Sequence, residues 1–141
     1  MNLQHLLLCT AVLTAGCGNL FIDGLERMRE DNKKNLAKLT VGMTRIDIEN
    51  VMGSSDAGGR LEDIVFGRLQ HLRATNPMRE ERVSGSDGAS YLVLFYYTDL
   101  RLRDDKITDD ELTPVVLHDD KIAGIGYGYL GERVPKYSGL R

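Results

Sequence analysis

Cysteine is scarce in this chain, and its placement limits the chemistry that it can support. Both cysteines, Cys9 and Cys17, lie before residue 20. No disulfide can therefore join two parts of the remaining chain, and a zinc site built on cysteine is excluded there. The sequence predicts a domain that is held together by an apolar core.

An excess of positive charge is also missing. The formal net charge of the 141 residues is −3, so the chain has no basic field to attract DNA or RNA, and we expect no nucleic-acid partner. Hydrophobic residues make up 42% and charged residues 28% of the chain, as in ordinary soluble domains. At this length, the composition predicts one globular domain with a modest core.

Residue patterns that carry catalysis or bind metal are missing as well. His71 and His118 are far apart in the sequence and have no cysteine near them, so zinc is not indicated. No serine lies in a nucleophile-elbow sequence. Acidic residues do cluster, but basic residues interrupt them and their spacing does not match a calcium loop. We expect a solvated connector there, with a cation site as the alternative, at Asp99, Asp104, Asp105, Asp109, Asp110 and Glu111. The sequence therefore predicts a protein that is not an enzyme and has no catalytic residue, cofactor or metal.

Hydrophobic runs long enough to span a bilayer are absent too. The apolar run at the N-terminus, Leu6–Leu13, is too short for that. It is followed by the small residues Thr14–Gly16 and then by Cys17. An apolar run that ends in small residues is typical of a secretory signal peptide. We expect this signal peptide to comprise residues 1–16.

The same N-terminal pattern resembles the lipobox of bacterial lipoproteins, in which cleavage occurs before a cysteine that then carries acyl chains such as palmitate. The resemblance implies that Cys17 is lipidated and that residues 17–23 form a short tether to a membrane. Gly18, and not an aspartate, follows the cysteine, which by the same resemblance implies the periplasmic side of the outer membrane. The alternatives are an ordinary signal peptide that happens to contain Cys17 and a buried N-terminal helix.

Both ends of one short helix can be read directly from the sequence. Thr44 is suited to be its N-cap, and Asp47 completes a capping box with it. Met43 and Ile48 have the spacing of a hydrophobic staple across the helix start, and Gly53 is suited to end the helix. Since a helix this short is not stable alone, it must pack on another element. The expected packing stripe consists of Ile48, Val51 and Met52.

Apolar spacing predicts a longer helix over residues 25–39 and a possible third helix over residues 60–73. The segment 78–90 is polar, charged and contains glycine, so we expect a long loop. Three strands are expected afterwards, over residues 91–97, 112–118 and 121–130.

Details within these strands indicate how they are arranged. Residues 91–97 are apolar on both faces, which predicts a strand that is central in the sheet or covered on both sides. Pro114 lacks an N–H, so we expect the second strand to lie at an edge or Pro114 to be its first residue. Asp119 and Asp120 fit a two-residue turn to the third strand.

Glycine alternates along the third expected strand, at Gly124, Gly126 and Gly128. Alternation would place the three glycines on one face of the strand. Such a bare face either is covered by a helix or by aromatic side chains, or forms a smooth groove for a partner or a lipid chain. The remaining residues, 131–141, are expected to form an exposed C-terminal tail.

One stretch of the chain resembles a known family. The sequence Lys38–Thr44, followed by a helix that ends at Met52 and Gly53, resembles the outer-membrane lipoproteins of the BamE family, also called SmpA/OmlA. The resemblance implies two helices ahead of a three-stranded sheet, with the fold motif at Gly42, Met43, Thr44 and Gly53. It also implies a scaffold role in the machinery that inserts β-barrels into the outer membrane. Residues 55–89 are an insertion relative to that family.

Taken together, these features predict an α+β domain over residues 24–130, with two or three helices packed on one face of a three-stranded antiparallel meander. The expected function is a non-catalytic interaction module, anchored to the membrane through its lipid and bound to an unidentified envelope protein. Its exposed sheet edge and the insertion 55–89 are the expected contacts. The alternative is a protein that binds a lipid or small molecule at the glycine-striped face.

Overall fold

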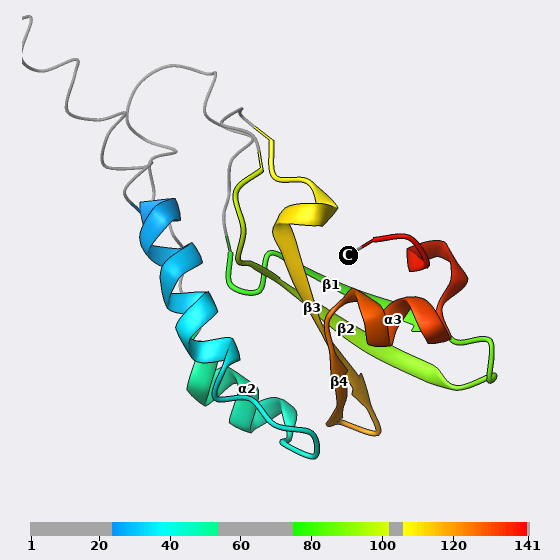
Figure 1. The fold of residues 1–141 in the computed structure, drawn as a ribbon. Coiled ribbons are helices and arrows are strands. Elements are labelled where there is room, and N and C mark those ends of the chain that lie inside the picture. The colour runs from blue at the N-terminus through cyan, green and yellow to red at the C-terminus, as the bar shows by residue number, and fades with distance from the viewer. Residues whose placement is uncertain (1–23, 54–74, 102–105, 141) are drawn as a thin grey trace, which may run out of the picture.

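The computed structural model describes residues 24–53, 75–101 and 106–140. They form an α+β domain in which helices precede a four-stranded antiparallel sheet of order β1-β2-β3-β4 (Figure 1). The helices are an unlabelled helix over residues 24–36, α2 (Arg45–Met52), α3 (Tyr127–Arg133), and the 3-10 helices η2 (Asp109–Glu111) and η3 (Pro135–Tyr137). The strands are β1 (Arg79–Ser84), β2 (Ser90–Tyr97), β3 (Leu112–His118) and β4 (Lys121–Ile125).

Several expected features fall outside these residues. They are the signal peptide 1–16, the lipidated Cys17, the tether 17–23, residues 55–74 of the insertion, and within these the possible helix 60–73. Among the helices that the structure describes, none combines the length and the apolar character needed to cross a membrane.

The helix predicted around Thr44 is confirmed as α2. The Thr44 hydroxyl accepts the backbone N–H of Asp47 at 3.3 Å, and the Asp47 carboxylate accepts the N–H of Thr44 at 2.8 Å. This reciprocal capping box satisfies backbone donors that have no partner within the helix. Gly53 ends the helix with φ at 72°, a conformation that glycine adopts without strain.

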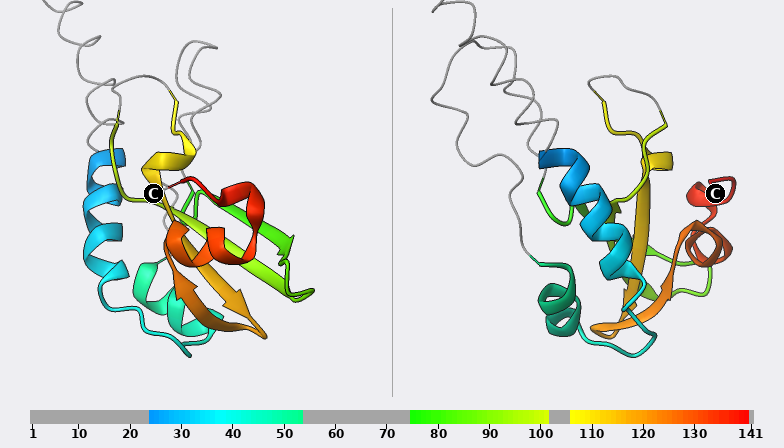
Figure 2. Two further views of the ribbon diagram at one scale, coloured as in Figure 1. Left: turned by 45° about the vertical axis from the view of Figure 1, so that its right-hand side comes forward. Right: turned by 60° about the vertical axis from the view of Figure 1, so that its left-hand side comes forward.

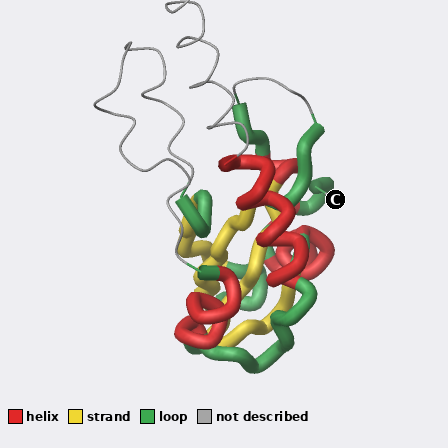
Figure 3. The backbone as a smooth tube through the Cα atoms, turned by 90° about the vertical axis from the view of Figure 1, so that its left-hand side faces the viewer, coloured by secondary structure: helices red, strands yellow, loops and turns green. Residues whose placement is uncertain are grey.

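The sheet is covered by helices on both faces (Figures 2 and 3). The helix over residues 24–36 and α2 lie on one side, whereas α3 and η3 lie on the other (Figure 2). The α2-side core consists of Leu39, Ile48, Met52, Leu94, Tyr96, Val115, Leu117 and Ile122. The α3-side core consists of Val83, Tyr91, Val93, Phe95, Tyr97, Leu112, Val116, Tyr127, Leu130, Val134 and Tyr137. The prediction that β2 is covered on both sides is confirmed, but the prediction that helices pack on only one face is wrong.

The prediction of a long loop over residues 78–90 is wrong, because this segment contains the fourth strand, β1. Four charged residues, from Arg79 to Arg82, hide the strand from a search for apolar alternation. Only Val83 in β1 is buried. β1 forms through its pairing with β2, from Arg79 opposite Phe95 to Ser84 opposite Ser90. Charged residues are common on a strand at the edge of a sheet.

Pro114 occupies neither of the two positions expected for it. It is the third residue of β3, and β3 lies between β2 and β4. Its carbonyl accepts the N–H of Gly126 at 2.7 Å, so its backbone groups point toward β4. Proline cannot donate a bond in return. Pairing therefore stops here, and β4 ends at Ile125.

The glycine stripe expected along residues 121–130 does not exist as a strand face. Ala123 has no partner in β3, because Val116 pairs with Gly124 and Leu117 pairs with Ile122. This bulge reverses the alternation of side chains. Gly126 has φ at 90° and starts α3, which contains Gly128. The expectation of a glycine-lined interaction or lipid groove at Gly124, Gly126 and Gly128 thus loses its structural basis.

The prediction that residues 131–141 form an exposed tail is also wrong. Residues 131–133 continue α3, and η3 follows it. Val134 and Tyr137 are each 5% exposed and belong to the α3-side core. Their burial explains why this segment is part of the domain, since each side chain removes apolar surface from water.

Candidate interaction surface

The two outer edges of the sheet differ in whether another segment of the chain pairs with them. Along β4, the segment before α2 pairs with the first residues of the edge: Gly42 donates its N–H to the carbonyl of Ile122 at 2.8 Å, and Ile122 donates its N–H to the carbonyl of Met43 at 2.8 Å. Thr44 also forms an isolated bridge with Lys121. The outer edge of β1, in contrast, pairs with no other strand within the described residues. An open edge of this kind can accept an additional strand.

The hydrogen-bond pattern shows which groups β1 offers at this open edge. Gly85 donates its N–H to the carbonyl of Ala89 at 2.8 Å, in register with the β1–β2 pairing. Bonded and non-bonded positions alternate in an antiparallel ladder. Residues 79, 81 and 83 therefore direct their backbone groups to β2. Glu80, Arg82 and Ser84 direct theirs away from the sheet.

Ion pairs hold β1 against the α3 side. Lys136 and the hydroxyl of Tyr137 both donate to the carboxylate of Glu81. Burial pushes the pKa of Glu81 upward, but these hydrogen bonds and the charge of Lys136 outweigh it and leave the pKa below its usual value. Arg79 lies over the ring of Phe95 and pairs with Asp109 at 3.0 Å.

Another ion pair ties β1 to the start of α2. The guanidinium of Arg45 contacts Glu80 at 2.7 Å and Glu49 at 2.9 Å. The hydrogen bond to Glu49 is the largest influence on the pKa of Arg45, which is raised above its usual value although partial burial opposes this. Exposed pairs of this kind add little stability, but this one fixes where the carboxylate of Glu80 lies.

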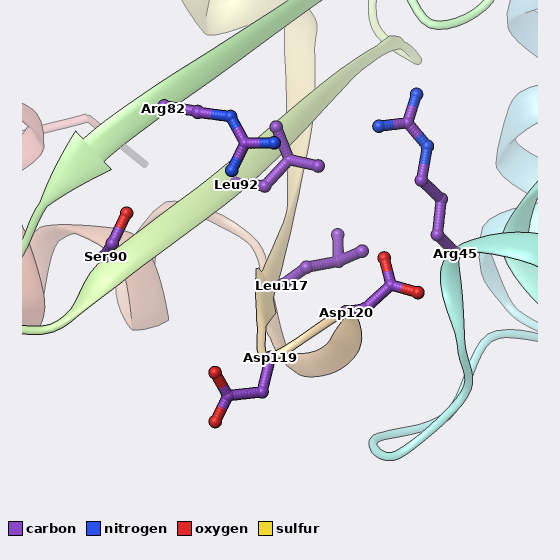
Figure 4. Close-up of a pocket in the computed structure, with 7 residues that line it drawn as sticks. All are labelled: Arg45, Arg82, Ser90, Leu92, Leu117, Asp119 and Asp120. Atoms are coloured by element: carbon purple, nitrogen blue, oxygen red, sulfur yellow. The ribbon is translucent and has the colours of Figure 1, made fainter.

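A groove of about 300 Å³ lies beside this ion pair, between α2, the β1–β2 hairpin and the β3–β4 turn (Figure 4). Its lining combines charged walls with two leucines from the sheet: Arg45, Arg82, Ser90, Leu92, Leu117, Asp119 and Asp120. Both aspartates form the predicted two-residue turn, with positive φ of 49° and 61°. Arg82 is exposed and has no acidic partner in the part of the chain that the structure describes.

The structure describes four of the six acidic residues in the predicted connector: Asp99, Asp109, Asp110 and Glu111. Asp104 and Asp105 lie outside the described residues. The buried carboxylate of Glu111 accepts the backbone N–H groups of Arg101 at 2.7 Å and Thr108 at 3.0 Å. Glu111 thus organises the connector between β2 and β3. Within residues 24–53, 75–101 and 106–140, no group of three His, Cys, Asp or Glu residues could hold a metal ion.

The sequence predicted an exposed sheet edge and the insertion 55–89 as contacts, but did not identify the edge strand β1, which lies within that insertion. The segment Gly85–Gly88 was the available signal, because turn residues ahead of an apolar strand are typical of a hairpin. The strand before that turn has no apolar alternation to support it. The groove was also missed, because its residues come from four separate segments of the chain.

Comparison with known proteins identifies one similarity. Residues 22–130 match the model of a family described as "Protein of unknown function (DUF3192)". The matched segment includes α2, the whole sheet and every residue that lines the groove. Neither the curated proteins nor the solved structures contain a match to this chain.

Proposed function

The chain belongs to the family described as "Protein of unknown function (DUF3192)", and we propose that it is a lipid-anchored periplasmic interaction module without catalytic activity. The observation that carries this proposal is the asymmetry of the sheet edges. The segment before α2 pairs with the β4 edge at Lys121 and Ile122, whereas β1 offers its outer backbone groups along its whole length beside a charged groove. Addition of an extended segment to such an edge is a common mode of protein recognition.

The membrane part of the proposal rests on the sequence before the domain. The apolar run Leu6–Leu13, the small residues after it and Cys17 resemble a lipobox. In this proposal Cys17 carries the lipid, the outer membrane is the final location, and the domain follows after a short tether. The open edge of β1 would then meet envelope proteins close to the membrane surface.

The resemblance to the BamE family suggests a more specific role, which we propose by analogy. The capped helix that starts at Thr44 and ends at Gly53 precedes an antiparallel sheet here, in the order that the resemblance implies. A scaffold role in the assembly or maintenance of the outer membrane is compatible with this order. The fourth strand, β1, is a feature that the three-stranded pattern does not include.

Replacement of Cys17 by alanine is expected to release the protein from the membrane fraction into the soluble periplasm. The reason is that an acyl chain contributes about 0.8 kcal/mol of membrane affinity for each buried CH₂ group. The measurement is fractionation of cells followed by immunodetection. Cys9→Ala serves as the matched control and should remain with the membrane. A Cys17→Ala variant that stays fully membrane-bound would contradict the lipid anchor.

Crosslinking in intact cells tests the interaction surface itself. A photoreactive residue at Ser84, on the open β1 edge, is expected to capture an envelope protein, whereas the same residue at Lys121, on the closed β4 edge, should capture none. Recovery of the barrel-insertion machinery would support the specific scaffold role. Recovery of other envelope proteins would retain the interaction module and remove that role. Equal capture at both positions, or capture only at Lys121, would contradict an interaction through β1.

A further inference from the structure

We propose that the open edge of β1 pairs with β1 of a second copy of this chain, about a two-fold axis. This inference rests on the proposed function, because it names an occupant of the same edge. The observation behind it is the order of charges along that edge. Glu80 and Arg82 carry opposite charge, and one residue separates them.

Geometry restricts how two β1 strands can meet. Only residues whose backbone groups point outward can exchange hydrogen bonds across the new pair. In β1 these are Glu80, Arg82 and Ser84. Val83 belongs to the α3-side core and Glu80 contacts Arg45 of α2, so the outward residues have their side chains on the α2 side of the sheet. A two-fold axis perpendicular to the sheet keeps these sides aligned in both copies.

One register satisfies these conditions and also matches charge. When the axis passes through Glu81, Glu80 of each copy lies opposite Arg82 of the other. The dimer then contains two equivalent cross-strand pairs of opposite charge, which stabilise neighbouring strands. The same register places Glu80 and Arg82 in the hydrogen-bonded positions, so backbone and side chains favour the same alignment.

Neighbouring registers are less favourable, because they either place like charges opposite each other or form no charge pair. An axis through Arg82 places two arginines opposite each other, and an axis through Glu80 does the same with two glutamates. Like charges in these positions destabilise a strand pair. An axis through Val83 places Arg82 opposite Ser84 and forms no charge pair. Charge therefore selects the register centred on Glu81.

In the single chain, the side chains at this edge already have the positions and free surface that the contact requires. Arg45 holds Glu80 at 2.7 Å, while 42% of the Glu80 side chain stays exposed and open to a second guanidinium. Arg82 has no acidic partner of its own among the described residues. At the centre of the register two Glu81 residues face each other, but each is already neutralised by Lys136 and hydrogen-bonded by Tyr137. Their mutual repulsion is reduced accordingly.

The dimer is expected to be weak in dilute solution. β1 spans Arg79–Ser84, and at about 3.3 Å per residue this gives an edge of roughly 20 Å. Pairing along this edge alone buries less than the approximately 800 Å² per partner of a standard interface. Attachment of both copies to one membrane would raise their effective concentration and promote pairing.

Charge reversal provides a test that uses the full chain in its own membrane. Two copies with different epitope tags are co-expressed, crosslinked briefly in intact cells, solubilised and recovered through one tag. Wild type is expected to recover wild type. Recovery should fall on the order of tenfold when both copies carry Arg82→Glu, or when both carry Glu80→Lys. A cell that expresses one copy with Arg82→Glu and one with Glu80→Lys should regain recovery, because this combination restores both charge pairs.

Lys121→Glu makes the same charge change on the closed β4 edge and should leave recovery unchanged. Circular dichroism of each variant checks that it remains folded. Loss of recovery that the mixed pair does not restore would overturn the dimer, as would unchanged recovery in the single variants. If wild-type copies do not recover each other, while Ser84 still captures a different envelope protein, the dimer fails and the proposed function stands.

Discussion

Replacement of Gly124 by alanine is expected to lower the free energy of unfolding by about 2–3 kcal/mol, as for an overpacked core. A Cβ atom at this position would lie 2.2 Å from Cγ of Tyr129, far inside van der Waals contact. Cγ joins the ring to the backbone side of the residue, so the ring cannot give way as the end of a flexible side chain can. Tyr129 is also stacked under the guanidinium of Arg133 at 3.5 Å. Chemical denaturation followed by circular dichroism measures the change.

Two further variants test whether the contact with the Tyr129 ring causes the destabilisation. Gly128→Ala introduces the same methyl group into α3, where the new Cβ meets no atom within 4 Å apart from its chain neighbours and the backbone of its own helix. It should leave stability unchanged or raise it by up to about 1 kcal/mol, because alanine favours a helix more than glycine does. In a Tyr129→Ala background, Gly124→Ala should lose most of its cost, since the clashing ring is gone. Equal destabilisation in both backgrounds would show that the close contact is not the cause.

Replacement of Asn32 by alanine is expected to destabilise the domain by about 2–3 kcal/mol. Asn32 is 1% exposed and donates from Nδ2 to the carbonyl of Tyr97 at 2.9 Å. Its Oδ1 accepts Nδ2 of Asn76 at 3.0 Å, and Asn76 also donates to the carbonyl of Met52 at 3.0 Å. The two amides thus connect the helix over residues 24–36 with the end of α2, β2 and the segment before β1. Removing one amide leaves buried polar groups without partners.

The matched control for this variant lies one helical turn away. Asn35 is only half-buried, and its side chain accepts a hydrogen bond from Lys38 at 2.8 Å. Asn35→Ala should change the free energy of unfolding by less than about 0.5 kcal/mol, as for surface substitutions. Thermal or chemical unfolding of both variants provides the comparison. If Asn32→Ala is as mild as Asn35→Ala, the buried amides do not contribute in the way described.

Local sequence signals predicted the elements that depend on neighbours in the chain. The capping box at Thr44 and the glycine at position 53 are local features, and α2 begins and ends accordingly. The apolar residues of β2 and β3 and the Asp119–Asp120 turn were recognised for the same reason. In each case, the residues that stabilise the element lie within a few positions of one another.

The elements that were missed depend on distant residues. β1 is charged, and pairing with β2 makes it a strand. The chain leaves the sheet after Ile125 because Pro114, in the neighbouring strand, cannot donate a hydrogen bond to Gly126. The local alternation of residues 121–130 contains no information about that neighbour, so the pattern favoured a longer strand.

The sequence by itself determined the α+β class, the capped helix α2, the two strands β2 and β3 with the turn after β3, and the order of charges in Arg79–Arg82. The tertiary structure decided that those charges lie on an open edge, that the segment before α2 pairs with the start of the other edge, and that α3 covers the second face. The physical reason is the range of the interactions. Caps and turns involve adjacent residues, whereas edges, bulges and grooves are set by strands that meet only after folding.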